Sequence, residues 1–204
     1  HRNIELRLVG DQTELQSLVT RIVGDNPRLQ IVHATEIVDM SESSADALRK
    51  KKDSSMRVAI NLVKAGSADA CVSSGNTGAL MATAKFVLKM LPGVDRPAII
   101  AQLPAKGGSL HMLDLGANTS ATAEQLFQYA MMGSIVSSDI VGIDRPRIAL
   151  LNIGVEDIKG NDTVRAAAAL LSASTLNYVG FIEGNDLFSG KADVVVTDGF
   201  TGNV

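Results

Sequence analysis

The sequence has little cysteine, few aromatic residues and no long hydrophobic run. Cys71 is its one cysteine, tryptophan is absent, and aromatic residues make up 3% of the 204 residues. A single cysteine excludes an internal disulfide framework and fits a reducing compartment. The scarcity of aromatic side chains disfavours surfaces that stack nucleic-acid bases. The longest apolar stretch, residues 79–94, is interrupted by Lys85 and Lys89, so no segment has the roughly 18 apolar residues that span a bilayer.

Neither sign of charge dominates. The sequence has 19 basic and 22 acidic residues, for a net charge of −3, whereas nucleic-acid-binding proteins usually carry a basic excess or patch. We therefore expect no nucleic-acid partner. The length and the 46% apolar content suit a buried core, and we predict a single truncated α/β domain over residues 1–204. Both ends look cut, because an apolar run starts at residue 4 and the last residues follow a glycine-rich turn; we expect a piece of a longer soluble protein.

Short apolar runs alternate with segments of helical period, which is typical of parallel strands joined by helical crossovers. The predicted fold is an α/β sandwich. The segments 98–103 and 110–115 are expected to be two strands joined by a polar loop. The predicted strands are residues 4–9, 29–34, 68–73, 98–103, 110–115, 147–153, 177–182 and 193–197. The predicted helices are residues 13–23, 54–65, 78–91, 121–137 and 163–172, and in the fourth a core-facing stripe is predicted at Leu126, Ala130, Met131 and Ser134.

Glycine, asparagine and small hydroxyl residues gather after the predicted strands. Residues 74–78 read Ser-Gly-Asn-Thr-Gly and precede a predicted helix. Glycine lets a ligand approach the backbone, and a helix N-terminus offers unpaired N–H groups and positive partial charge. The loop is therefore chemically adequate to hold an anion, although the same residues are also ordinary turn and cap chemistry.

Similar loops recur at residues 114–119, 152–161, 183–186 and 197–203. In open α/β sheets, ligands bind where strands end and loops lead into helices. Five such loops predict one cleft lined by small polar residues and backbone amides. None has the spacing of a Walker A loop or of the dinucleotide-binding glycine fingerprint.

Lys159 is the single basic residue inside these loops. It could be an ion-paired structural residue, since Glu156 and Asp157 are close in sequence, or a point charge that holds phosphate. His33 and His111 lie in separate predicted strands without ligand spacing, so no metal site is expected. Cys71 is expected to be a small buried hydrophobe in a strand.

The basic run of residues 49–52, Arg-Lys-Lys-Lys, has two interpretations. One is a solvated turn before a helix that Ser54 and Ser55 begin. The other is a landing site for an acidic carrier protein or for anionic lipid head groups.

Several strings together resemble a known family. They are Lys-Lys-Asp-Ser-Ser-Met at 51–56, the string from Ala68 to Met81, Asp-Arg-Pro-Ala at 95–98, residues 150–161 and residues 195–204. In this order they are similar to the bacterial acyl-acyl-carrier-protein:phosphate acyltransferases, the PlsX family. The resemblance runs over practically the whole chain and is far more specific than any single glycine loop.

The resemblance implies transfer of a long-chain acyl group from an acyl-carrier-protein thioester to inorganic phosphate, giving acyl phosphate for phospholipid synthesis. It implies a three-layer α/β sandwich with a mostly parallel sheet, similar to phosphotransacetylases and isocitrate/isopropylmalate dehydrogenases. It also implies acyl carrier protein and phosphate as partners, a homodimer, and a cytoplasmic location with peripheral membrane contact through a C-terminal part absent here. No metal or cofactor is expected. The alternatives are a phosphotransacetylase-like enzyme that uses coenzyme A thioesters, and a non-catalytic fragment that binds a phospho-ligand.

For this reaction we assign catalytic roles to Lys159, Asn118 and Asp198, with Lys159 holding phosphate. The residues assigned to binding phosphate or substrate are Ser74, Gly75, Asn76, Thr77, Gly78, Gly154, Glu156, Asn185, Gly199, Gly202 and Asn203.

Overall fold

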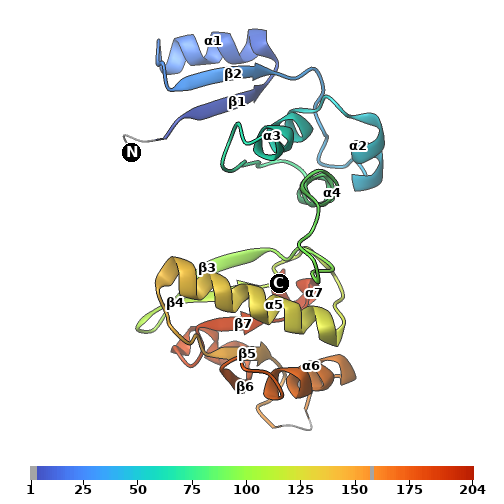
Figure 1. Cartoon of the computed structure of the whole chain (residues 1–204), viewed down its shortest axis with the longest axis vertical. Helices are drawn as coiled ribbons and strands as arrows, with labels where there is room; N and C mark the ends of the chain where they lie inside the picture. Colours follow the sequence, from blue (N-terminus) through green and yellow to red (C-terminus); the bar gives the residue numbers. More distant parts are fainter. Residues whose placement is uncertain (1–3, 157–158) are drawn as a thin grey trace. The chain divides into compact units, whose positions relative to one another are not determined.

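The computed structural model describes residues 4–156 and 159–204. The chain divides into two compact units, and the division falls between Leu91 and Pro92. Each unit has its own hydrophobic core. Figure 1 shows the helices and strands of both units. The single domain over residues 1–204 stays a prediction.

The first unit begins with a parallel pair of strands joined by a helix: β1 (Leu6–Gly10), α1 (Gln12–Ile22) and β2 (Leu29–His33). The Asp11 carboxylate caps α1 by accepting a hydrogen bond from the Glu14 backbone N–H at 2.9 Å. No residue of these three elements is buried. Both strands and the helix were predicted from the sequence to within a few residues.

Three helices complete the first unit: α2 (Ser44–Lys50), α3 (Ser55–Lys64) and α4 (Thr77–Leu88). They bury a core of Ala47, Met56, Ile60, Ala79 and Val87. Ser54 caps α3 as predicted, and α4 begins within one residue of its predicted start.

Two predictions for this unit are wrong. Residues 68–73 form no strand, and Cys71 is exposed rather than buried. A strand needs a neighbour for its backbone N–H and C=O groups, and the parallel pair β1–β2 does not take this segment as a third member. The interpretation of the basic run as a turn is right in part: Arg49 and Lys50 form the last turn of α2, and Lys52 lies in the exposed turn that leads to α3.

The second unit is built on a five-stranded sheet. Its strands are β3 (Ile100–Ala105), β4 (Gly108–Leu113), β5 (Ile148–Leu151), β6 (Tyr178–Ile182) and β7 (Val194–Val196), in the spatial order β3-β4-β7-β5-β6. β3 is antiparallel to β4, as expected for two strands joined by a short loop, and all other pairs are parallel. The predicted α/β class with a mostly parallel sheet is confirmed.

The side chains of the central strands point alternately to the two faces of this sheet. Val194 and Val196 pack with α5 (Ala123–Val136) and α6 (Asp162–Ser172) on one face. Val195 packs on the opposite face, where the 3-10 helix η2 (Gly184–Ser189) contributes Leu187. Two short elements complete the unit, the π-helix η1 (Ser137–Val141) and the helix α7 (Gly199–Gly202).

The predicted core stripe of α5 is right in part. Leu126 and Ala130 are buried, but Met131 is 37% exposed. Tyr129 and Gly133 are the other buried positions of this helix, so the buried face is turned by about one residue from the predicted one.

Candidate functional site

The carboxyl ends of four strands meet at one edge of the sheet in the second unit. Leu113 of β4 pairs with Val196 of β7, which also pairs with Leu150 of β5, and Leu151 pairs with Ile182 of β6. The loops that start at residues 114, 197, 152 and 183 therefore leave the sheet from the same edge. This is the edge at which open α/β sheets bind ligands.

Asp114 organises the loop after β4. Its side chain is fully buried. One carboxylate oxygen accepts hydrogen bonds from the backbone N–H groups of Ile99 and Ala117, and the other accepts from the backbone and the side chain of Asn118, all at 2.8–3.0 Å. Asp114 was assigned no role from the sequence. A carboxylate near the end of the predicted strand 110–115, two residues before Gly-Ala-Asn, was the available signal, but its four donors come together only in the fold.

Asn118, assigned a catalytic role, is buried at this centre. Its amide nitrogen donates to the Pro97 carbonyl at 2.9 Å and to Asp114 at 2.8 Å. Both amide hydrogens are therefore engaged within the protein, which suits an orienting role better than donation to a substrate.

Tyr129 of α5 lies next to this buried network. Burial, with a smaller contribution from the negative charge of Asp114, raises the pKa of Tyr129 to about 12. The tyrosine hydroxyl, already protonated at neutral pH in an ordinary setting, resists ionisation further here because a second negative charge beside Asp114 would be buried.

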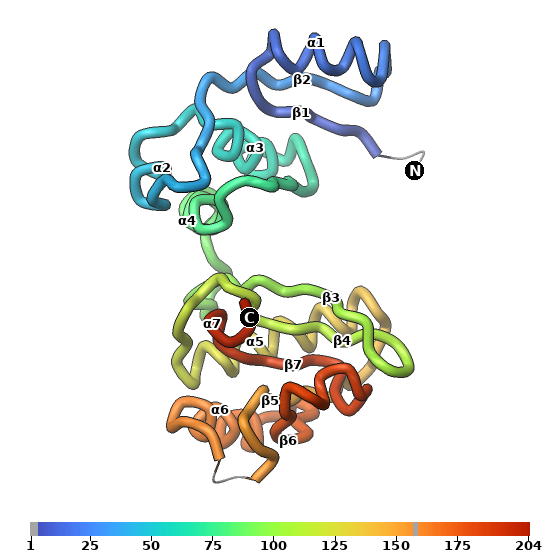
Figure 2. Tube along the Cα trace, turned by 180° about the vertical axis from the view of Figure 1, so that it is seen from behind, coloured from blue at the N-terminus to red at the C-terminus, as the bar shows by residue number. Residues whose placement is uncertain are grey.

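Helix α7 lies directly on the loop that follows β4, as Figure 2 shows. The Gly199 N–H donates to the Asn118 carbonyl at 2.8 Å. A methyl group on Gly199 would come within 2.6 Å of that oxygen, and one on Gly202 within 1.9 Å of the Asp114 carbonyl oxygen. Gly199 and Gly202 were predicted to bind phosphate or substrate. Their contacts with the protein's own backbone are sufficient to explain why both positions are glycine.

Asp198 and Asn203, at the two ends of α7, take part in the same assembly. The Asp198 carboxylate caps α7 by accepting from the Thr201 N–H at 2.8 Å. The Asn203 side chain lies beside Gly116 of the neighbouring loop. Asn118, Asp198, Gly199, Gly202 and Asn203 are therefore brought together by two adjacent loops.

The loop after β5 brings together a second group of assigned residues. The side chains of Glu156 and Lys159 both lie against Gly154, where a methyl group would be 2.7 Å from a Glu156 oxygen and 3.0 Å from the Lys159 Cγ. The Asn152 side-chain amide donates a hydrogen bond to the Lys159 carbonyl oxygen at 3.2 Å. Lys159 is exposed, and among the described residues it makes no ion pair. Asp157, the other acidic neighbour weighed as its partner, lies outside the described residues.

Asn185 follows β6 at the outer end of the same edge. It lies in η2 and is exposed. Its neighbour Asp186 pairs with Lys191 at 2.5 Å, so a second cation in this region is already engaged.

The loop of residues 74–78 belongs to the first unit. Asn76 caps α4 through the Ala79 N–H at 3.0 Å, and its amide nitrogen donates to the carbonyl oxygens of Asp39, Met40 and Glu42 at 2.9–3.3 Å. The rest of the loop is more open: Ser74, Thr77 and Gly78 are exposed and Gly75 is half-buried. The prediction that all five loops line one cleft stays a prediction, because this loop and the other four belong to different units.

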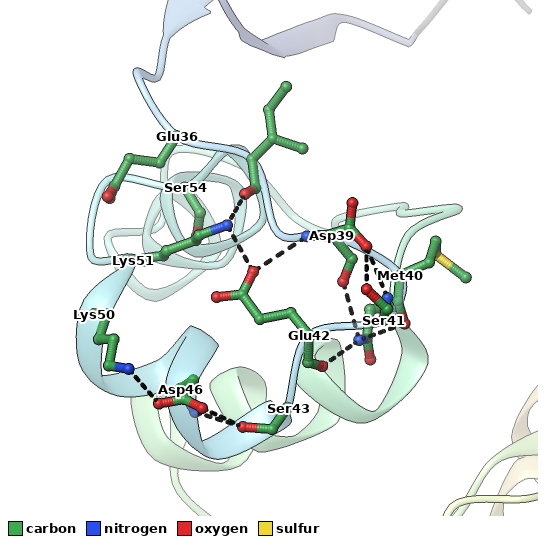
Figure 3. Close-up of polar contacts among 12 residues, drawn as sticks. Glu36, Asp39, Met40, Ser41, Glu42, Ser43, Asp46, Lys50, Lys51 and Ser54 are labelled. Carbon is green, nitrogen blue, oxygen red and sulfur yellow. Dashed lines mark hydrogen bonds and ion pairs between the residues drawn. The ribbon is translucent and has the colours of Figure 1, made fainter.

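Lys51 also contacts this segment, residues 37–42 (Figure 3). Its ammonium group donates to the Ile37 carbonyl at 2.5 Å and pairs with Glu42 at 2.6 Å. Lys51 and Asn76 therefore fix the segment that runs beside the 74–78 loop.

The two surface hollows described in the structure contain none of the assigned residues. The larger, about 780 Å³, lies along α1 and includes His33; the smaller lies on α2, α3 and α4. The assigned residues of the second unit lie instead at the strand ends, where the loops converge. In the described part of the chain no cluster of three potential metal ligands is found, and no helix there is long and apolar enough to cross a membrane.

Comparison with known proteins identifies the family. A sequence model described as "Fatty acid synthesis protein" matches residues 1–204. The chain belongs to the fatty acid synthesis protein family. The phosphate acyltransferase of Nitrosococcus oceani is 57% identical over 203 residues, covering 99% of this chain and 60% of its own length. That of Alkalilimnicola ehrlichii is 57% identical over 206 residues, covering 100% of this chain and again 60% of its own length.

These matches confirm the resemblance that the sequence strings indicated. The chain spans about 60% of the length of the curated relatives that it matches. Two solved structures share its fold: the EutD phosphotransacetylase of Staphylococcus aureus (TM-score 0.64, 20% identity, 98% of this chain and 72% of that one) and a branched-chain phosphotransacylase of Enterococcus faecalis (TM-score 0.54, 17% identity, 96% and 81%). The implied similarity to phosphotransacetylases is confirmed at the level of the fold.

Proposed function

We propose that the protein carrying this chain transfers an acyl group from an acyl-carrier-protein thioester to inorganic phosphate, and so supplies acyl phosphate for phospholipid synthesis. The observation that carries the proposal is the 57% identity to phosphate acyltransferases over practically the whole chain. Convergence of the assigned loops at one sheet edge supports it.

The reaction needs positioning and charge rather than a covalent enzyme intermediate. A phosphate oxygen attacks the thioester carbonyl, a C–O bond forms and the C–S bond breaks. The hydrogen phosphate proton passes to the departing thiolate, so the products are acyl phosphate and free carrier thiol. A thiolate leaves readily, and a preorganised cation with backbone amides can stabilise the developing negative charge.

In this proposal Lys159 is the group that meets phosphate. It is exposed at the strand-end edge and is the single basic residue of the assigned loops. Because Gly154 has no side chain, the aliphatic part of the Lys159 side chain can lie close to the loop backbone. The Asn152 amide hydrogen-bonds to the Lys159 carbonyl oxygen. A lysine held in this way presents a point charge to a phosphate dianion.

The roles of the other assigned residues follow from their contacts. Asn118 and Asp198 orient the two loops on β4 and β7, because their polar groups are already hydrogen-bonded to Asp114, Pro97 and Thr201. The assignment of residues 74–78 to phosphate or substrate binding stays a prediction. The homodimer, the cytoplasmic location and the peripheral membrane contact implied by the family stay predictions.

A second candidate is a phosphotransacetylase-like enzyme that uses coenzyme A thioesters, which the shared fold favours. The complete protein should be given matched acyl thioesters of carrier protein and of coenzyme A, with and without phosphate. Acyl phosphate is trapped as hydroxamate and free thiol is counted. Phosphate-dependent product from the carrier thioester supports the proposal; a strong preference for coenzyme A favours the second candidate; no product from either supports a non-catalytic role in binding a phospho-ligand.

Lys159→Ala in the same assay tests the assigned cation. We expect a loss of about 2–4 kcal/mol in transition-state stabilisation, or roughly 30- to 1,000-fold in kcat/KM. The matched control is Lys106→Ala, which removes an exposed lysine in the β3–β4 turn, at the opposite end of β4. Near-normal rates for Lys159→Ala at both low and saturating phosphate would contradict the assignment of Lys159 as the group that binds phosphate.

A further inference from the structure

A hollow on the first unit is lined mainly by basic side chains together with one aromatic ring. It encloses about 530 Å³ and is lined by Leu48, Arg49, Lys52, Arg57 and Phe86. These residues come from α2, the turn after it, α3 and α4. Lys89, the residue directly after α4, contacts the Phe86 ring of this hollow. We call Arg49, Lys52, Arg57, Phe86 and Lys89 the cationic hollow.

The Phe86 ring contacts two of these basic groups, Arg57 and Lys89, and is itself partly exposed to solvent. The ring is 51% exposed. The guanidinium of Arg57 lies 5.1 Å from the ring centroid and the ammonium of Lys89 lies 4.8 Å from it. Contact with a ring face orients a cation without neutralising it, so the hydrogen-bond donors of both groups stay available to an anion.

The acidic residues nearby are already engaged elsewhere. Asp46 pairs with Lys50 at 2.8 Å and Glu42 with Lys51 at 2.6 Å, as Figure 3 shows. Asp53 accepts hydrogen bonds from the backbone and hydroxyl of Thr35. Within residues 4–156 and 159–204, no ion pair involves Arg49, Lys52, Arg57 or Lys89. Positive charge is therefore concentrated at the hollow, although the chain as a whole carries −3.

We propose that the cationic hollow docks an acidic protein surface, and that this surface belongs to the carrier protein that delivers the thioester; the identity of the partner rests on the proposed function. Charge complementarity carries the inference, because arginine and lysine are the natural partners of surface carboxylates. Leu48 and Phe86 add apolar contact area to the same hollow, and protein interfaces commonly combine apolar and charged contacts. A concave surface fits a convex helix of a partner protein, whereas a planar bilayer would leave it unfilled.

The first test measures binding directly in the complete protein. The probe is fluorescently labelled acyl carrier protein, followed by anisotropy at low and at physiological salt. The variant is Arg49→Glu with Lys52→Glu, and the matched control is Arg21→Glu with Lys64→Glu, which makes the same change of charge at exposed positions of the same unit. We expect the Arg49/Lys52 variant to weaken carrier binding by about tenfold or more and to flatten its salt dependence, while the control stays within about twofold.

A kinetic arm separates docking from chemistry. The KM for the carrier thioester should rise in the Arg49/Lys52 variant while kcat stays the same. The KM for a small uncharged thioester, acyl-N-acetylcysteamine, should not change. An equal rise for both thioesters would locate the defect in the reaction site and overturn the proposal, as would unchanged carrier binding.

A third arm distinguishes a membrane from a protein partner. Sedimentation with anionic phospholipid vesicles should be the same for the wild-type protein and the Arg49/Lys52 variant. Loss of vesicle binding together with unchanged carrier binding would make the hollow a lipid site. Absence of acyl phosphate in the wild-type assay would refute the proposed function but leave the binding measurement decisive for docking.

Discussion

His111 is a buried titratable residue outside the candidate site. It lies on β4 and is 5% exposed, and its Nδ1 is 2.8 Å from the hydroxyl oxygen of Ser137, which is fully buried. Burial lowers the pKa of His111 below its ordinary value near 6.5. The ring is therefore held neutral in the folded protein, and its role here is to pair a strand with the end of α5.

This makes a pH prediction. The pKa of His111 is lower in the folded protein than in the unfolded chain, where it is about 6.5. At pH values between the two, the unfolded chain therefore binds more protons than the folded protein. The stabilising contribution is complete above pH 6.5 and is lost as the pH falls toward the lowered value. We expect the free energy of unfolding, measured with urea from pH 7.5 to 5.5, to fall more steeply for the wild-type protein than for His111→Gln. The matched control is His33→Gln, which keeps the buried histidine and therefore its acid sensitivity; equal slopes for the wild type and His111→Gln would contradict the prediction.

At the scale of elements, α5 approaches the sheet closely because of a single glycine. A methyl group on Gly133 would lie 2.5 Å from Val194 Cγ1 and 2.8 Å from Leu113 Cδ1. Both of those side chains are in the main core of the second unit. The same helix brings Tyr129 up to the Asp114 network, so the seating of α5 and the shape of the candidate site are connected.

Gly133→Ala should therefore destabilise the protein. Alanine favours a helix by about 1 kcal/mol over glycine, but overpacking a tight core commonly costs about 1–3 kcal/mol. A 2.5 Å approach to a buried side chain places the overpacking cost in the upper part of this range, about 2–3 kcal/mol. We therefore expect the free energy of unfolding, measured by chemical denaturation, to fall by roughly 1–2 kcal/mol net. Ile135→Ala, at a position of α5 that is 61% exposed, serves as the control and should change it by less than about 0.5 kcal/mol. An unchanged or higher stability of Gly133→Ala would show that α5 can move away at little cost.

At the scale of the whole chain, burial is distributed unevenly between the two units. The central strands β5 and β7 are buried on both faces of a five-stranded sheet. The pair β1–β2 and helix α1 contain no buried residue. A two-stranded sheet with little buried surface has small free energies of local opening.

Hydrogen exchange should report this difference. In the chain of 204 residues, we expect the hydrogen-bonded amides of β1 and β2 to exchange about tenfold or more faster than those of β5 and β7 at the same pH. Exchange resolved to single amides by nuclear magnetic resonance is the measurement. Equal protection in the two sheets would mean that the chain opens as one cooperative unit.

Much of the fold follows from local pattern. The two strands of the β3–β4 hairpin, the helix that Ser54 caps and the alternation of strands and helices were predicted from the sequence. Turn residues, caps and apolar period are local properties. The hairpin loop is shorter than predicted, because β3 runs to Ala105 and β4 starts at Gly108. Helix α2 was missed, although Ser43 and Asp46 form a capping arrangement at its start. Its seven residues bury only Ala47, which leaves little apolar period to detect.

The sequence by itself determined the α/β class, the family and the set of polar loops that follow the strands. Only the tertiary structure decided which of those residues touch. Asp114 becomes an anchor because donors from residues 99 and 117–118 converge on it, and Gly199 and Gly202 are required because α7 rests on the backbone of the loop after β4. Residues 68–73 have the composition of a strand but no partner strand among the described residues. The physical reason is the same in each case: hydrogen bonding and close packing between distant segments depend on where the chain brings them together, which local sequence does not encode.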